Sequence, residues 1–206
     1  MDKVCCIILN YNDASTTMSL VDEIREYDCL DSIVVVDNCS TDGSWKQLKA
    51  LRGLDKVHVL RTEENGGYGS GNQAGIDYAV TYLEAGYVII ANPDIHVRAC
   101  CIERVKLALD GMPEAVMASA RVTSPEGGDL FSYWTLLPMW KDLLDTGLIT
   151  RRLFKPMLNT PAYRLKEGGD EGCRLVDAVP GSFFMLKLGL LTPQEIKELF
   201  DRHMFL

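Results

Sequence analysis

The chain has 206 residues, 47% of them hydrophobic and 24% charged, a balance typical of one globular domain with a substantial core. Its formal net charge of −8 argues against a nucleic-acid duplex as partner, because duplex binding depends on clustered Lys and Arg. No apolar run approaches the roughly 18 to 20 residues that cross a bilayer, and no signal-like leader precedes the first strand, so we expect a cytoplasmic protein.

The chain opens with short apolar runs that predict buried strands at residues 4–9, 33–36 and 57–60. Apolar residues at helical spacing follow the first run over about 15–27. A second helix is predicted after Ser44, behind a polar turn. This alternation of strand and helix is the pattern of a parallel α/β sheet.

Residues 63–75 contain five glycines and lead into a helical pattern that ends near Glu84. Such a stretch predicts a loop whose backbone approaches a ligand, with the N–H groups of the following helix favouring an anion. A flexible connector is the alternative. The match of Gly69, Gly71 and Ala74 to a dinucleotide fingerprint is discounted, because that fingerprint belongs in the turn after the first strand.

The apolar run at 87–91 has no polar alternation and predicts a strand buried on both faces. Asn92, Pro93 and Asp94 end it, since proline has no N–H to continue the ladder. A lone carboxylate at the carboxyl end of such a strand is well placed to hold a divalent cation. An ordinary turn is the alternative interpretation.

A helix at 98–109 and a strand at 115–120 complete four successive alternations of strand and helix. They indicate an α/β fold with three layers and a mostly parallel, Rossmann-like sheet.

The composition changes after residue 122. The next fifty residues mix aromatic with basic side chains, which suits either a surface that touches a lipid-linked partner at a membrane or aromatic packing beneath a long irregular cover. A strand at 173–179, an apolar run at 183–186 and a helix opened by Thr192 and Pro193 follow. The mixed side chains are Phe131, Tyr133, Trp134, Trp140 and Phe154 with Lys141, Arg151, Arg152 and Lys155.

Polar residues follow four of the predicted strands at one edge of the sheet. A nucleotide sugar needs such a set: an amide or carboxylate for the base, close backbone for ribose and sugar, and a metal for the diphosphate. The chain has no Walker sequence and no Gly-x-Ser-x-Gly elbow. The four sets are Asn10-Tyr11-Asn12, Asp37-Asn38, the glycine stretch and Asn92-Pro93-Asp94.

These motifs, in this order and spacing, resemble family 2 of the inverting glycosyltransferases, and in particular its rhamnosyltransferase-type members. The resemblance implies a GT-A fold, a nucleotide-diphosphate sugar donor, Mg or Mn, and a glycan or lipid-linked acceptor in surface polysaccharide or cell-wall biosynthesis. We expect one domain over 1–206, with a nucleotide-sugar-binding half at 1–122 and an acceptor-side half at 123–206. The motifs are Ile7-Ile8-Leu9-Asn10-Tyr11-Asn12, Val34-Val35-Val36-Asp37-Asn38-x-Ser40-x-Asp42-Gly43-Ser44, Asn65-x-Gly67-Tyr68-Gly69-x-Gly71-Asn72-x-x-Gly75 and Asn92-Pro93-Asp94.

Carried over by position, the resemblance implies that Asn10 and Asp37 meet the base, with Asp37 on a pyrimidine N–H, and that Asp94 binds the metal. Gly181 and Ser182 resemble the family's loop near donor sugar and acceptor. The implied donor-site residues are Asn10, Tyr11, Asn12, Asp37, Asn38, Asn65, Gly67, Tyr68, Gly71, Asn72, Asn92 and Asp94.

The same resemblance places the general base beyond Leu206, with Asp201 before it and His203 as an outside candidate. We therefore expect a shortened chain that binds donor and transfers slowly, because a missing base lowers the rate roughly 100- to 10,000-fold. One alternative is a non-catalytic nucleotide-sugar-binding domain. Another is a nucleotidyltransferase, although residues 10–15 lack the Arg and Lys that a triphosphate needs. Apolar surface near the C-terminus would favour a homo-oligomer.

Overall fold

The computed structural model describes residues 3–124, 127–128, 130, 133, 139–154 and 172–200. The chain forms two compact units, one of Met1–Ala120 with Gly181–Leu206 and the other of Arg121–Pro180. This division differs from the predicted halves, because the chain from Gly181 onward returns to the first unit.

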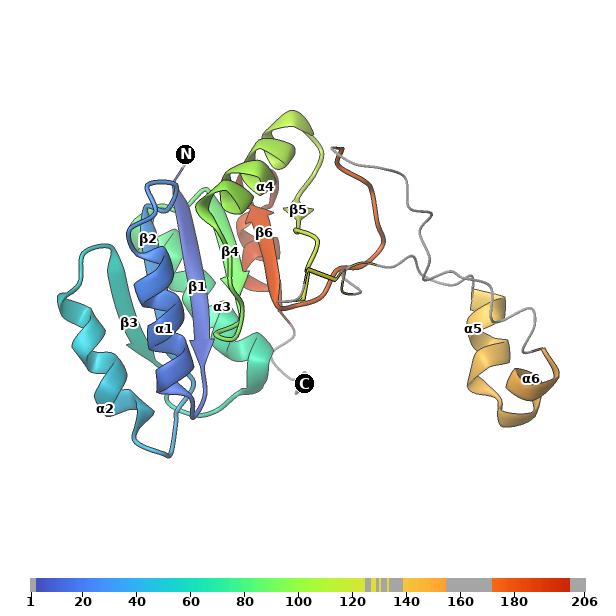
Figure 1. Ribbon diagram of the computed structural model, residues 1–206, viewed down its shortest axis with the longest axis horizontal. Coiled ribbons are helices and arrows are strands. Elements are labelled where there is room, and N and C mark those ends of the chain that lie inside the picture. Colours follow the sequence, from blue (N-terminus) through green and yellow to red (C-terminus); the bar gives the residue numbers. More distant parts are fainter. Residues whose placement is uncertain are drawn as a thin grey trace. The chain divides into compact units, whose positions relative to one another are not determined.

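A six-stranded sheet lies at the centre of the described part of the first unit, in the order β3-β2-β1-β4-β6-β5 (Figure 1). The first four strands along the chain run parallel, whereas β6 pairs antiparallel with both β4 and β5. The mostly parallel α/β fold is thus confirmed, but the strand predicted at 115–120 is only two residues long. The strands are β1 (Val4–Asn10), β2 (Ser32–Asp37), β3 (Val57–Arg61), β4 (Tyr87–Ala91), β5 (Met117–Ala118) and β6 (Phe183–Lys187).

Helices connect these strands, and side chains cap the starts of two of them. The Asp13 carboxylate accepts from the backbone N–H of Thr16 at the start of α1, and Thr192 forms a capping box with Glu195 at the start of α8. The helices of this unit are α1 (Ala14–Ile24), α2 (Ser44–Leu48), η1 (Lys49–Gly53), α3 (Gly67–Leu83), α4 (Ala99–Gly111), η2 (Leu188–Leu190) and α8 (Pro193–Lys197).

Helices cover both faces of the sheet. Cys6 and Ile8 on β1 share a buried cluster with apolar residues of α1 and α4. The intervening Ile7 faces α3, where a methyl group added at Gly75 would lie 2.6 Å from Ile7 Cγ2. Figure 1 shows α1 in front of the strands and α3 behind them, so the three predicted layers are present.

Much of the glycine-rich stretch that was predicted to be a loop is helical in the structure. Helix α3 begins at Gly67, so Gly69, Gly71 and Gly75 lie inside a helix rather than in a ligand-facing loop. All three are buried. At Gly71 and Gly75 the missing side chain lets α3 approach the sheet, because a Cβ there would overlap with β1 side chains.

In the second unit, α5 (Met139–Thr146) and α6 (Leu148–Leu153) form a helical hairpin. The Thr150 hydroxyl donates to the carbonyls of Leu144 (2.7 Å) and Gly147 (3.0 Å) at its corner. The irregular cover predicted here is therefore wrong for these residues, and Trp140 is 51% exposed. Three other residues of that prediction, Phe131, Trp134 and Lys155, lie outside the described residues.

Two further predictions can be compared with the structure. The strand predicted at 173–179 is wrong, because that stretch contains only an isolated bridge residue, Ala178. Within the described ranges, none of the helices combines the length and the apolar character that crossing a bilayer requires.

Candidate functional site

Asn10 and Asp37 end neighbouring parallel strands and lie opposite each other in the register. Both side chains have 0% exposed surface. The Asn10 amide donates to Asp37 Oδ1 (2.9 Å) and to Ser40 Oγ (3.0 Å), and its oxygen accepts from the Thr17 hydroxyl (2.9 Å). Asn10 therefore joins three neighbouring segments at the carboxyl edge of the sheet.

The buried negative charge of Asp37 is balanced by Arg61 at the second carboxylate oxygen. This oxygen lies 3.3 Å from Arg61 Nε and 3.4 Å from the backbone nitrogen of Ser40. Arg61 also lies over the Trp45 ring, 5.5 Å from its centroid. The carboxylate of Asp37 is therefore inaccessible in this structure to the nucleotide base that the sequence analysis expects it to contact.

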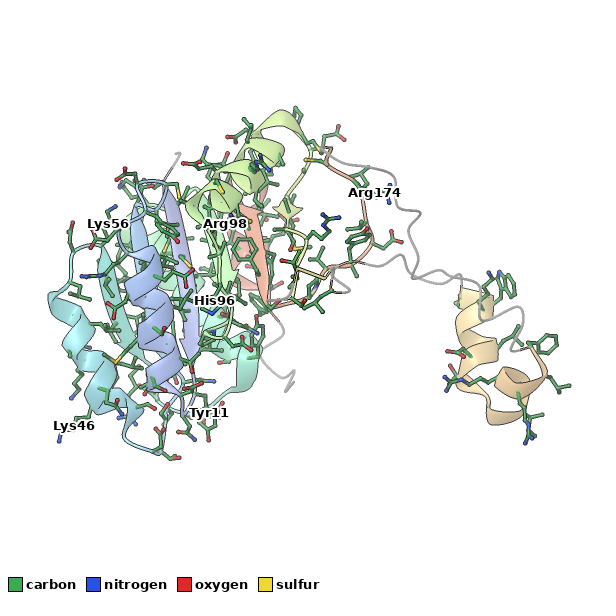
Figure 2. All side chains as sticks on the ribbon, viewed as in Figure 1. Tyr11, Lys46, Lys56, His96, Arg98 and Arg174 are labelled. Carbon is green, nitrogen blue, oxygen red and sulfur yellow. The ribbon has the colours of Figure 1, made fainter. Side chains whose placement is uncertain are left out.

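Asn12 links the loops that follow β1 and β2. Its side-chain oxygen accepts from the backbone N–H groups of Thr41 (2.8 Å) and Asp42 (3.3 Å). Its backbone N–H donates to Ser40 Oγ (2.9 Å). Its φ of +55° is in the left-handed region, which asparagine tolerates better than most residues. The neighbouring Tyr11 is 47% exposed, and Figure 2 shows it at the edge where β1 ends.

Asn38 fixes the start of α3 to the end of β2. Its amide donates to Asn65 Oδ1 (2.8 Å) and to the Gly67 carbonyl (3.1 Å), and its oxygen accepts from the Thr62 hydroxyl (3.1 Å). Gly67 has a φ of +82°, a conformation that favours glycine. The second and third motifs of the sequence are therefore in direct contact.

Gly181 and Ser182 lie between the third and fourth motifs. The Tyr68 hydroxyl donates to the Gly181 carbonyl (2.7 Å), and the Asn92 N–H donates to the Ser182 carbonyl (2.8 Å). Burial raises the pKa of Tyr68 to about 12, so its hydroxyl keeps its proton at neutral pH. All four motifs and this turn thus form one continuous set of contacts.

Asn72 presents a buried acceptor at the same end of α3. Its amide donates to the Tyr68 carbonyl (3.0 Å), but its oxygen has no hydrogen-bond partner among the described residues. A buried acceptor without a partner is costly unless a water or a ligand supplies a donor. Its neighbour Gly71 is buried against Leu9.

Asp94 is exposed on the turn after β4, beside a shallow groove of about 380 Å³. Nowhere in the described ranges do three or more His, Cys, Asp or Glu side chains gather to hold a metal ion. One exposed carboxylate fits a hard cation that takes its remaining oxygen ligands from a diphosphate and water. The groove is lined by Ser15, Thr16, Ser19, Leu20, Pro93, Asp94, Ile95 and His96.

Three residues that support the site were not among the sequence candidates. Ser40 receives hydrogen bonds from Asn10 and Asn12, and its place in the motif after β2 was the available signal. Arg61 ends β3 at the same edge of the sheet, while nothing in the sequence marks Thr17. The candidates for the base region, Asp201 and His203, lie outside the described residues.

Comparison with protein families gives one match over most of the chain. The family model described as Glycosyl transferase family 2 matches residues 5–171. Among curated proteins, the low-salt glycan biosynthesis hexosyltransferase Agl10 of Haloferax volcanii is 30% identical over 100 residues, which is 47% of this chain and 29% of that protein.

Solved structures include similar chains. The mannosyltransferase PcManGT from Pyrobaculum calidifontis, in complex with GDP-Man and Mn2+, aligns with a TM-score of 0.50 at 23% identity, over 60% of this chain and 36% of that one. TarS 1-349 of S. aureus in complex with UDP-GlcNAc gives 0.45 at 23% identity, over 53% and 31%. The chain thus spans between 29% and 36% of the length of these proteins.

Proposed function

The chain belongs to glycosyl transferase family 2, and from this premise we propose that it binds a nucleotide-diphosphate sugar and transfers the sugar to an acceptor hydroxyl with inversion. The observation that carries the proposal is the continuous set of contacts from Asn10 to Asn92 along the carboxyl edge of the sheet. Ligands of open α/β sheets bind at this edge.

The site residues divide into two roles by exposure. Tyr11, Asn65 and Gly181 are exposed, and we assign them to contact with the donor. Asn10 and Asp37 are fully buried and hydrogen-bonded, and we assign them to holding the loops in place. Asn72 is fully buried as well and donates to the Tyr68 carbonyl, so we assign it to holding the start of α3.

Asp94 is the residue proposed to hold Mg or Mn, with Asn92 beside it. When bound, the ion neutralises charge on the diphosphate leaving group. The exposure of Asp94 supports this role, because a cation that arrives with the donor needs an accessible carboxylate. The N–H of Asn92 holds Ser182 close to the same turn.

In the proposed reaction, the acceptor oxygen forms a bond to the anomeric carbon as the bond from that carbon to the diphosphate oxygen breaks. The nucleoside diphosphate leaves with the bonding electron pair, and the acceptor proton passes to a base. Rhamnose carried by deoxythymidine diphosphate is the first donor to test, because the motifs resemble those of rhamnosyltransferase-type members of the family. The glycan biosynthesis role of the Haloferax volcanii protein supports a glycan product.

The test is to incubate the chain and Mn with a panel of nucleotide-diphosphate sugars and to identify the products. With water as the acceptor, we expect slow hydrolysis that releases a nucleoside diphosphate and free sugar with inverted anomeric configuration, measured by NMR. Release of nucleoside monophosphate with sugar phosphate would overturn the proposal, since a different bond would have been cleaved. Binding without cleavage of any donor would instead favour a non-catalytic donor-binding domain.

A further inference from the structure

Gln73 lies in α3, one turn beyond Tyr68, and is only 2% exposed. Its amide nitrogen donates to the carbonyl of Ile196 (2.9 Å) and to Asp77 Oδ1 (2.9 Å). Its oxygen accepts from the backbone N–H of Phe200 (3.3 Å). One buried side chain thus contacts the main chain at two points of the segment that contains α8.

Among the described residues, the hydrogen bonds of Gln73 are the ones that join this segment, residues 192–200, to α3. None of the residues of α8 is buried, so hydrophobic burial of the helix does not anchor it. The capping box between Thr192 and Glu195 stabilises the helix itself but makes no contact with α3. Gln73 therefore supplies the polar attachment of the segment to α3.

The Phe200 ring connects the same segment to the donor site. It meets the Tyr68 ring edge-on, with centroids 6.1 Å apart, and lies 6.5 Å from the Phe184 ring. Tyr68 in turn donates to Gly181. A displacement of the segment would remove one neighbour of Tyr68, whose hydroxyl holds the turn before β6.

We propose that Gln73 is a positioning residue that holds residues 192–200 against α3, so that docking of this segment and binding of a nucleoside diphosphate stabilise each other. The inference rests on the proposed donor site. Coupling of this kind is reciprocal: a ligand that orders the Tyr68 side of the site must also favour the docked segment.

Three variants separate this role from a general effect on stability. Gln73→Met keeps the length of the side chain and removes its hydrogen bonds to Ile196 and Phe200. Gln194→Met makes the same change at an exposed glutamine of α8 itself. Val105→Ala removes buried atoms from α4, on the other face of the sheet, and lowers stability without touching the segment.

Amide hydrogen exchange of a peptide covering residues 196–200 is measured for each protein, with and without nucleoside diphosphate and Mn. Loss of the two hydrogen bonds should speed exchange in Gln73→Met about 10-fold or more. Nucleotide should slow exchange in the unmodified chain, in Gln194→Met and in Val105→Ala, but not in Gln73→Met, whose nucleotide affinity should also fall.

The outcomes distinguish the two proposals. If nucleotide binds the unmodified chain without protecting residues 196–200, or binds Gln73→Met equally well, the coupling is wrong while the donor site stands. If Gln73→Met exchanges no faster than Gln194→Met, the positioning role is wrong regardless of ligand. If no nucleotide binds the unmodified chain, the donor site itself is refuted and the coupling with it.

Discussion

The two ends of the candidate site are built in opposite ways. Where β1 and β2 end, Asn10 and Asp37 have no exposed surface, and their polar atoms bond to Thr17, Ser40 and Arg61. Where β4 ends, Asp94 is exposed and makes no hydrogen bond or ion pair with any described residue. Polar residues at one sheet edge therefore differ in accessibility, since some are buried and hold the loops while others are open to solvent.

The strongest test of this contrast substitutes the same residue type at both ends. Asn10→Ala leaves several buried groups without partners, so we expect it to lower the free energy of unfolding by about 3 kcal/mol. Asn92→Ala should change it by less than about 0.5 kcal/mol, because that side chain is only half-buried. Urea denaturation measures both, and equal losses would show that the two ends are not different.

A second test concerns the glycines that bring α3 to the sheet. A Cβ at Gly75 would lie 2.6 Å from Ile7 Cγ2, and Ile7 is fully buried and cannot move aside. Gly75→Ala should therefore destabilise by about 2 kcal/mol despite its higher helix propensity. Gly111→Ala, in the last turn of α4 with open space around it, should be neutral or slightly stabilising, and thermal denaturation measures both variants.

We expect a smaller loss of stability from a change at Tyr68, which lies between the two ends of the candidate site. Tyr68→Phe removes the hydroxyl that donates to Gly181 and should cost about 1 kcal/mol of stability. Tyr82→Phe makes the same change on a tyrosine that is 70% exposed, and its urea midpoint should stay within error of the parent. A Tyr68→Phe protein as stable as Tyr82→Phe would mean that the contact to Gly181 does not form in solution.

The strands and most helices were predictable, because apolar runs and capping residues are local signals. Val4–Asn10 and Tyr87–Ala91 are strands as their composition predicts, and Thr192 begins a helix as expected. The strand predicted at 173–179 failed because a short apolar pattern does not reveal whether a partner strand is available. The antiparallel direction of β6 is likewise set by tertiary packing and not by composition.

The sequence predicts which candidate residues follow the strands, but not how buried their side chains are. The sequence shows that Asn10 and Asp37 follow strands at one edge, yet it cannot show that they bond to each other and become inaccessible. The sequence also does not reveal what each glycine packs against. Gly71 and Gly75 therefore suggested a loop, whereas in the structure they let α3 pack closely against the sheet. The contacts of Gln73 with Ile196 and Phe200 carried no sequence signal, because those two partners lie more than 120 residues away.

The central claim is that an exposed carboxylate after β4 binds a metal-bound diphosphate. It is tested most directly by thermal-shift titration with uridine, deoxythymidine, guanosine and cytidine diphosphates, each with and without Mn, on the parent chain, Asp94→Ala and Asp55→Ala. Asp55 is exposed in the turn before β3, at the opposite edge of the sheet, and serves as the matched control.

We expect one nucleotide at about 100 times its dissociation constant to stabilise the parent and Asp55→Ala by roughly 2.7 kcal/mol. This shift should require Mn and should be absent in Asp94→Ala, whose stability without ligand should match that of the parent. No shift with any nucleotide, or an equal shift in Asp94→Ala, would contradict the account.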